Sequence, residues 1–187
     1  MRWTAFFTRK DPLFFALRVV VFLPLISLLT ITAPFEAAIE KPLNRANAWL
    51  TYVALKGFGV QADLGGEIIY SQGFTMQVVT ACTGLYTYIF LFVVMTSFPA
   101  TWRMRLKGML VGSAIIAVLN QVRLYTLFLL GQSYPKLFDD VHVYIWQGVT
   151  IAVVLLYWYA WARKALGPAG AAGGGAPKPA ATQTNIP

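Results

Sequence analysis

Four long apolar segments constrain this chain more than any other feature of its sequence. They cover residues 13–33, 82–99, 108–130 and 143–161. At about 1.5 Å per helical residue, each spans roughly 27 to 34 Å, which matches the hydrocarbon core of a bilayer. Hydrophobic residues make up 58% of the chain and charged residues 12%, a composition that excludes an ordinary soluble domain. We therefore predict an all-α integral membrane protein with about four transmembrane helices, in a single domain over residues 1–166.

The first apolar segment has a basic start, as a secretory signal peptide does. Its apolar run is longer than the core of such a peptide, and further spans follow it. We therefore expect a retained anchor, in which Arg18 lies near the amino-terminal end and snorkels to the membrane surface.

Lysine and arginine are distributed unequally between the two sides of a four-span chain. One side carries nine of them: Arg2, Arg9, Lys10, Arg103, Arg105, Lys107, Arg163, Lys164 and Lys178. The other side carries four: Lys41, Arg45, Lys56 and Lys136. The positive-inside rule makes the first side cytoplasmic, so both termini are expected in the cytoplasm. Because this flanking pattern explains the net charge of +8, a nucleic-acid partner is disfavoured.

The long segment between the first two spans has predicted structure of its own. From residue 43 to Gly57, apolar residues recur at helical spacing, which predicts an amphipathic helix at the extracytoplasmic membrane surface. Residues 67–71 and 74–79 flank Gln72-Gly73, which predicts a small β-hairpin leading into the second span.

The last part of the chain, residues 167–187, is rich in Ala, Gly and Pro. It has too few large apolar residues to fold, so we predict a disordered cytoplasmic tail. The sequence has no phosphate-binding loop, and one Cys with one His cannot build a structural zinc site. No cofactor and no metal are expected.

Cys82, the only cysteine, opens the second predicted span in the sequence Ala-Cys-Thr-Gly-Leu at residues 81–85. Thr80 can cap that helix, and the free N–H groups and positive dipole at its start would favour a thiolate. The alternative is a small buried apolar side chain, the commoner fate of a lone cysteine. Redox chemistry is disfavoured, because one thiol cannot form an intramolecular disulfide.

Arg123 lies seven residues before the end of the third predicted span, about 10 Å below the outer surface by helical rise. An arginine in a membrane is costly unless it is paired or hydrated, and it indicates a functional site by default. Asn120 lies three residues earlier, on a neighbouring part of the same helical face. The alternative is a structural arginine that snorkels outward or bonds to backbone carbonyls.

His142, the only histidine, opens the fourth predicted span just after Asp139 and Asp140. It can titrate near neutral pH, and either acid could orient its ring. The alternative is an interfacial histidine beside solvated loop acids. Taken together, however, Cys82 and His142 supply a nucleophile and its base, and Arg123 supplies positive charge for a developing oxyanion. The sequence therefore predicts a thiol active site near the extracytoplasmic face.

These residues resemble the exosortase and archaeosortase family of membrane transpeptidases. The resemblance rests on Ala-Cys-Thr-Gly-Leu at 81–85, Asn-Gln-Val-Arg at 120–123 and His142 at the start of a late span. The short length is most similar to the compact exosortase H type, since larger exosortases have further spans. The resemblance implies a cysteine protease or transpeptidase, a hydrolase of protein sorting, in the plasma (bacterial inner) membrane. Its substrates would be membrane-anchored proteins whose carboxy-terminal signal combines a short motif, a transmembrane helix and basic residues.

By the same resemblance, Cys82 is the nucleophile, His142 the general acid/base and Arg123 the group that stabilises or positions the scissile carbonyl. A thioester acyl-enzyme would form and be resolved by an unknown acceptor. The main alternative is a non-enzymatic membrane assembly or scaffold protein, in which the surface helix and hairpin bind a partner. A small transporter ranks lower, because four spans without a repeat offer few intramembrane charges.

Overall fold

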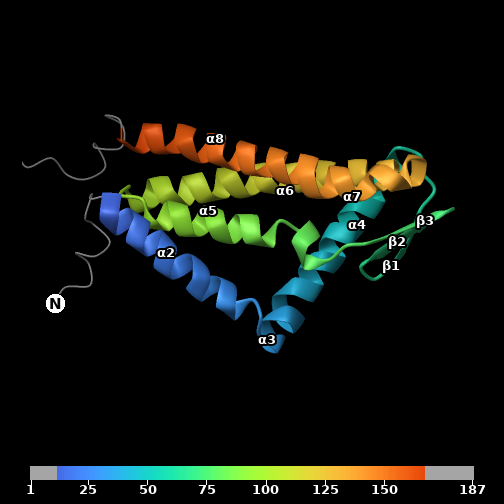
Figure 1. The fold of residues 1–187 in the computed structure, drawn as a ribbon, viewed down its shortest axis with the longest axis horizontal. Helices are drawn as coiled ribbons and strands as arrows, with labels where there is room; N and C mark the ends of the chain where they lie inside the picture. Colours follow the sequence, from blue (N-terminus) through green and yellow to red (C-terminus); the bar gives the residue numbers. More distant parts are fainter. Residues whose placement is uncertain (1–11, 167–187) are drawn as a thin grey trace, which may run out of the picture.

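The computed structural model describes residues 12–166, so the predicted tail lies outside the described part of the chain. Three helices run lengthwise beside one another: α5 (Leu85–Ser97), α6 (Trp102–Ser133) and α8 (Trp146–Leu166). Helix α2 (Pro12–Leu29) packs on α5 at one end of the molecule and diverges from it toward the other (Figure 1). Apart from residues 98–101, which connect α5 to α6, the described residues at this end are helical.

At the opposite end, α4 (Lys41–Gly57) crosses the long helices obliquely, and a small sheet lies beside it (Figure 1). Helix α4 follows the short α3 (Ala33–Phe35) and a π-helical turn, Glu36–Glu40. A second short helix, α7 (Phe138–Asp140), links α6 to a π-helical segment, Val141–Ile145, that continues into α8. Both π-helical segments and all the strands of the described residues therefore lie away from the end where α5 turns into α6.

Two helices are long and apolar enough to cross a membrane by themselves. They are α6 and the helical stretch Pro135–Leu166, of which α8 is the main part. Helix α5 is apolar but has only 13 residues, which cover about 20 Å. The helices Leu13–Leu28 and Ala33–Gly57 form a pair bent by 79°, which counts as a third candidate if the pair is one span. The predicted number of about four spans thus stays a prediction.

Prolines set the ends of the central helices. Pro99 follows Phe98, whose extended backbone (φ −75°, ψ 139°) ends α5, as expected for a residue before proline. Helix α6 then begins at Trp102 and ends at Ser133, two residues before Pro135. Helices α5 and α6 consequently pack side by side as an antiparallel pair.

The predicted hairpin is confirmed and belongs to a three-stranded antiparallel sheet. Strands β2 (Ile68–Ser71) and β3 (Phe74–Gln77) pair around the Gln72-Gly73 turn, where Gly73 has a φ of +82° that favours glycine. Strand β1 (Asp63–Gly65), which pairs with β2, was not predicted. Three residues are too short to produce a recognisable alternation.

The predicted surface helix is present as α4, but its polar side is the one that faces the protein. The buried side chains are Asn44, Asn47, Ala48, Thr51 and Leu55. The apolar residues Trp49, Leu50 and Val53 remain exposed. An outward apolar face is what a helix lying against a membrane requires, so the polar side of α4 is free to bind other helices.

Arg18 does not snorkel, and that prediction is wrong. Its side chain is 1% exposed, and its Nη1 donates a hydrogen bond of 2.9 Å to the carbonyl oxygen of Ser97. Ser97 is the last residue of α5, where carbonyl groups lack intrahelical donors and attract cations. The arginine thus joins α2 to the end of α5.

Candidate active site

Cys82 lies in a single turn of 3-10 helix, Thr80–Cys82, between β3 and α5. Its N–H donates to the carbonyl oxygen of Val79 at 2.8 Å. Gly84 follows with a φ of +77°, and α5 begins only at Leu85. The prediction that Cys82 opens the second span under a Thr80 cap is therefore wrong, because the left-handed Gly84 separates the two helices. The α5 dipole does not begin at the thiol.

The backbone conformation of Gly84 is what favours glycine at this position. A residue with a Cβ is strained at this φ. A Cβ there would make only ordinary van der Waals contacts, 3.4 Å from Ile116 Cγ2 and 3.7 Å from Asn120 Oδ1. The glycine in Ala-Cys-Thr-Gly-Leu thus sets the turn between the Cys82 segment and α5.

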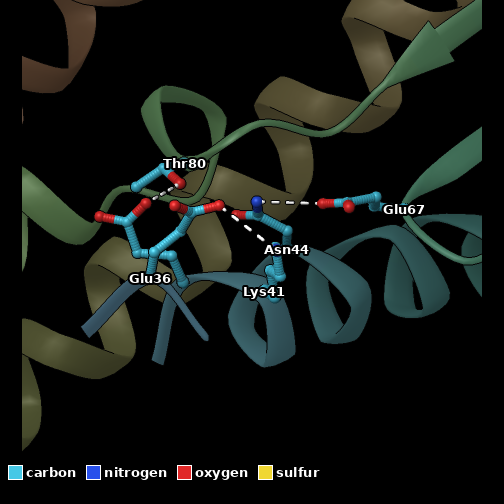
Figure 2. Close-up of polar contacts among 6 residues, drawn as sticks. Glu36, Lys41, Asn44, Glu67 and Thr80 are labelled. Atoms are coloured by element: carbon cyan, nitrogen blue, oxygen red, sulfur yellow. Dashed lines mark hydrogen bonds and ion pairs between the residues drawn. The ribbon is translucent and has the colours of Figure 1, made fainter. Parts of the chain in front are cut away.

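Thr80 has a different role from the predicted cap. Its Oγ1 donates a hydrogen bond of 2.7 Å to Glu40 Oε2, in the π-helical turn before α4 (Figure 2). This contact joins positions 40 residues apart, two residues before the cysteine. It holds the Cys82 turn against the start of α4.

Two further polar contacts lie along the first turns of α4 (Figure 2). Asn44 Nδ2 donates to Glu67 Oε2 at 3.1 Å, which links the helix to the residue preceding β2. Lys41 Nζ lies 3.4 Å from Glu36 Oε1, but both side chains are more than half exposed, so this ion pair contributes little. The Asn44 contact fixes the sheet that leads to the cysteine.

Cys82 and His142 meet although 60 residues separate them. Cys82 Sγ lies 3.7 Å from His142 Nε2, within range of a hydrogen bond to sulfur. His142 lies in the π-helical segment Val141–Ile145, inside a helical stretch that starts at Pro135, and so it does not open that helix as predicted. Its ring packs on Phe138 with centroids 5.7 Å apart. Irregular π-helical turns of this kind occur often at functional sites.

Arg123, on α6, is the third predicted member of the site. Its side chain is 6% exposed, so it does not snorkel outward. The guanidinium lies within electrostatic range of both Cys82 and His142. Its buried Nε has no hydrogen-bond partner among the residues that the structure describes. The structure therefore brings a positive charge and a thiol–imidazole contact together.

Asn120 takes part in an amide network one turn from Arg123. Asn120 Nδ2 and Gln121 Nε2 both donate to Asn47 Oδ1, at 3.1 Å and 2.8 Å. Thr51 Oγ1 lies 3.1 Å from Gln121 Oε1, to which it donates. The network joins α4 to α6. None of Asn47, Thr51 and Gln121 was predicted as part of the site, although the helical spacing of Asn47 and Thr51 along α4 was a signal for those two.

The two predicted acids differ in their relation to His142. Asp139 interacts electrostatically with the imidazole. Both acids are exposed, and within residues 12–166 no hydrogen bond joins either Asp139 or Asp140 to His142. In the same range, no group of three or more His, Cys, Asp or Glu side chains is placed to hold a metal ion.

The chain is similar to a known protein family over most of its length. The family model described as transmembrane exosortase (Exosortase_EpsH) matches residues 7–161. No curated protein and no solved structure shows a significant match. The matched segment contains Cys82, Arg123 and His142, and the family implies a cysteine transpeptidase in general terms. The chain therefore belongs to the transmembrane exosortase family.

Proposed function

We propose that this protein is a membrane-embedded cysteine protease or transpeptidase that cleaves a carboxy-terminal protein-sorting signal. The observation that carries the proposal is the 3.7 Å contact between Cys82 Sγ and His142 Nε2, with the buried Arg123 in electrostatic range of both. Family membership supports the class of reaction. The geometry supports the assignment of residues, since a nucleophile beside its base is the arrangement that activates a thiol.

In the first step, His142 accepts the proton of the Cys82 thiol, and the thiolate sulfur attacks the carbonyl carbon of the scissile peptide bond. The positive charge of Arg123 stabilises the oxyanion that develops on the carbonyl oxygen. Collapse of this intermediate breaks the C–N bond, and the protonated His142 gives its proton to the leaving amine. A thioester on Cys82 and a free carboxy-terminal fragment result.

In the second step, an acceptor nucleophile attacks the thioester carbonyl and His142 takes its proton. The acyl group is transferred, and the thiolate leaves and is reprotonated. Water as the acceptor would give hydrolysis, and an amine or hydroxyl would give transpeptidation or esterification. The same three side chains serve both steps.

The site would act at the extracytoplasmic face of the bacterial inner membrane. Within residues 12–166, every carboxylate lies in the region that also contains Cys82 and His142: Glu36, Glu40, Asp63, Glu67, Asp139 and Asp140. The first turns of α6, at the other end of that helix, contain the basic residues Arg103, Arg105 and Lys107. The positive-inside rule then supports an extracytoplasmic thiol.

The test is processing of a co-expressed protein from the same genome that ends in a short motif, an apolar helix and a basic tail. We expect Cys82→Ala and Cys82→Ser to abolish the shift of this substrate to its processed size, because neither retains a thiol. Ser133→Ala, at the exposed end of α6, is the control and should process normally. Processing by Cys82→Ala at the rate of the unaltered protein would reject the proposal.

A further inference from the structure

A cavity lies at the opposite end of α6 from Arg123 and the thiol site. Its volume is about 590 Å³, and it is formed between the first turns of α6 and the last turns of α8. From Lys107 to Arg123 is 16 residues of helix, or about 24 Å. This cavity is therefore separate from the thiol site.

Three cations line the cavity: Arg103 and Lys107 from α6, and Lys164 from α8. None of the described residues that line it is acidic. The carboxylates of the described residues all lie in α7, in the sheet region, or in the turn Glu36–Glu40 before α4, away from this end (Figure 1). The only other acidic residue of the chain, Asp11, is outside the described residues. The positive charge of the cavity is thus not balanced by any described side chain.

The amino terminus of the 32-residue helix α6 adds to this positive potential. Thr101, which also lines the cavity, precedes the helix and makes no side-chain capping hydrogen bond. The first N–H groups of a helix have no intrahelical acceptor, and they bind anions together with the helix dipole. Two independent features, the cation triad and the uncapped helix start, therefore favour the same kind of ligand.

The inner wall of the cavity is aromatic and held in place. Tyr157 donates a hydrogen bond of 2.5 Å to the Gly108 carbonyl oxygen, and Trp161 Nε1 donates to the Met104 carbonyl oxygen at 3.3 Å. A Cβ on Gly108 would lie only 2.3 Å from Trp161 Nε1, so the glycine makes room for the indole. A cationic rim above an apolar wall suits a molecule that has both an anionic group and a hydrocarbon part.

We propose that this cavity binds an anionic phospholipid, whose headgroup phosphate is held by Arg103, Lys107, Lys164 and the start of α6. The two helices that form the walls are each long and apolar enough to span a membrane. Because the cavity lies at the ends of these helices, it lies at the level of the lipid headgroups. Basic pockets between transmembrane helices bind such headgroups. The aromatic wall favours a lipid over a free phosphate, because a free phosphate has no apolar part to contact Tyr157 and Trp161.

The test is titration of the full-length protein, in neutral detergent, with phosphatidylglycerol or with phosphatidylcholine of the same acyl chains. Native mass spectrometry measures the fraction of protein with bound lipid. We expect phosphatidylglycerol to bind at least about tenfold more tightly than phosphatidylcholine. The triple variant Arg103→Gln, Lys107→Gln, Lys164→Gln should lose this preference.

The matched control removes the same number of exposed cations from the other end of the molecule: Arg45→Gln, Lys56→Gln and Lys136→Gln. It should keep the preference. A second variant, Ala160→Trp, places bulk on the cavity wall without changing charge, and it should weaken binding of phosphatidylglycerol.

Three results would overturn the proposal. The first is equal binding of the two lipids by the unaltered protein. The second is an equal loss of preference in the cavity triple and the control triple, which would reflect general charge. The third is displacement of phosphatidylglycerol by inorganic phosphate at millimolar concentration, which would assign the cavity to free phosphate.

Discussion

At the scale of the residue, Cys82 combines a reactive neighbourhood with low exposure. Its side chain is 7% exposed and belongs to an apolar cluster with Leu124 and Phe128, while its sulfur contacts His142. Reactivity of a thiol needs access as well as a base. A membrane-impermeant reagent is therefore expected to label Cys82 slowly even if it is the nucleophile. Labelling alone would not separate the enzyme from the scaffold alternative.

The guanidinium of Arg123 offers a planar pair of donors as well as a positive charge. We expect Arg123→Lys to reduce the rate of substrate processing by roughly 100-fold, because the lysine keeps a charge but loses the planar fork that positions an oxyanion. The rate is measured with purified protein in proteoliposomes. Arg163→Lys, the same change at an exposed position of α8 that does not line the cavity, is the control. Unchanged processing by Arg123→Lys would show that only its charge is used.

At the scale of the element, α4 is the support on which the site rests. It holds the Cys82 turn through Glu40 and Thr80, and it holds α6 through Asn47. Asn47 Oδ1 is the shared acceptor of two amide donors from α6, and the Asn47 side chain is buried. Loss of this one oxygen leaves both donors without a partner.

The stability of the α4–α6 contact depends on the side-chain oxygen of Asn47. We expect Asn47→Ala to lower the free energy of unfolding by about 1–3 kcal/mol, the cost of leaving a buried polar group unsatisfied. The thermal midpoint in detergent should fall, and amide exchange in α4 should rise. Arg45→Ala, on the exposed side of the same helix, should leave both unchanged. Equal effects of the two substitutions would mean that the network does not hold α4 on α6.

Local patterns in the sequence predicted α4, the β2–β3 hairpin and the long helices, because each has its own periodicity or turn residues. The exposed Leu50 and Val53 fit the membrane-surface helix that the sequence predicted. The sequence did not predict that the polar residues on the other side of α4 would pack on α6. The Thr80 cap was also wrong, because Thr80 lies inside the 3-10 turn, α5 begins only after Gly84, and the hydroxyl donates to Glu40 from 40 residues away. Such tertiary contacts leave no local signal.

In the candidate site, too, some features have a local sequence signal and others depend only on tertiary packing. Cys82, Arg123 and His142 stand out in the sequence because cysteine and histidine each occur once and because an arginine within an apolar segment is costly. The distance between Cys82 and His142 depends instead on how α5, α6 and the π-helical segment before α8 pack. Asn47, Thr51 and Gln121 are ordinary polar residues in sequence, and only the crossing of α4 and α6 makes them a network.

At the scale of the whole molecule, charge is separated along the long axis. The described carboxylates lie around α3, α7 and the sheet, whereas the basic start of α6 and the basic end of α8 lie together at the opposite end (Figure 1). If the positive-inside rule sets the orientation, Lys136 faces the outside and Lys164 the cytoplasm.

Because Cys82 is the only cysteine, the orientation can be tested in a Cys82→Ala background. We expect Lys136→Cys to react with an impermeant thiol reagent in intact spheroplasts, whereas Lys164→Cys should react only after permeabilisation. Both positions are exposed, so access differs only by the side of the membrane. The reverse labelling pattern would place the thiol site in the cytoplasm.

The central claim is that Cys82 forms a thioester with its substrate beside His142. The most direct measurement is mass spectrometry of the purified protein, quenched in acid at a series of short times after it is mixed with substrate. We predict a substrate-derived acyl group on the peptide containing Cys82, sensitive to hydroxylamine, and much less adduct in His142→Gln. Substrate cleavage with no acyl adduct on Cys82 would contradict the account.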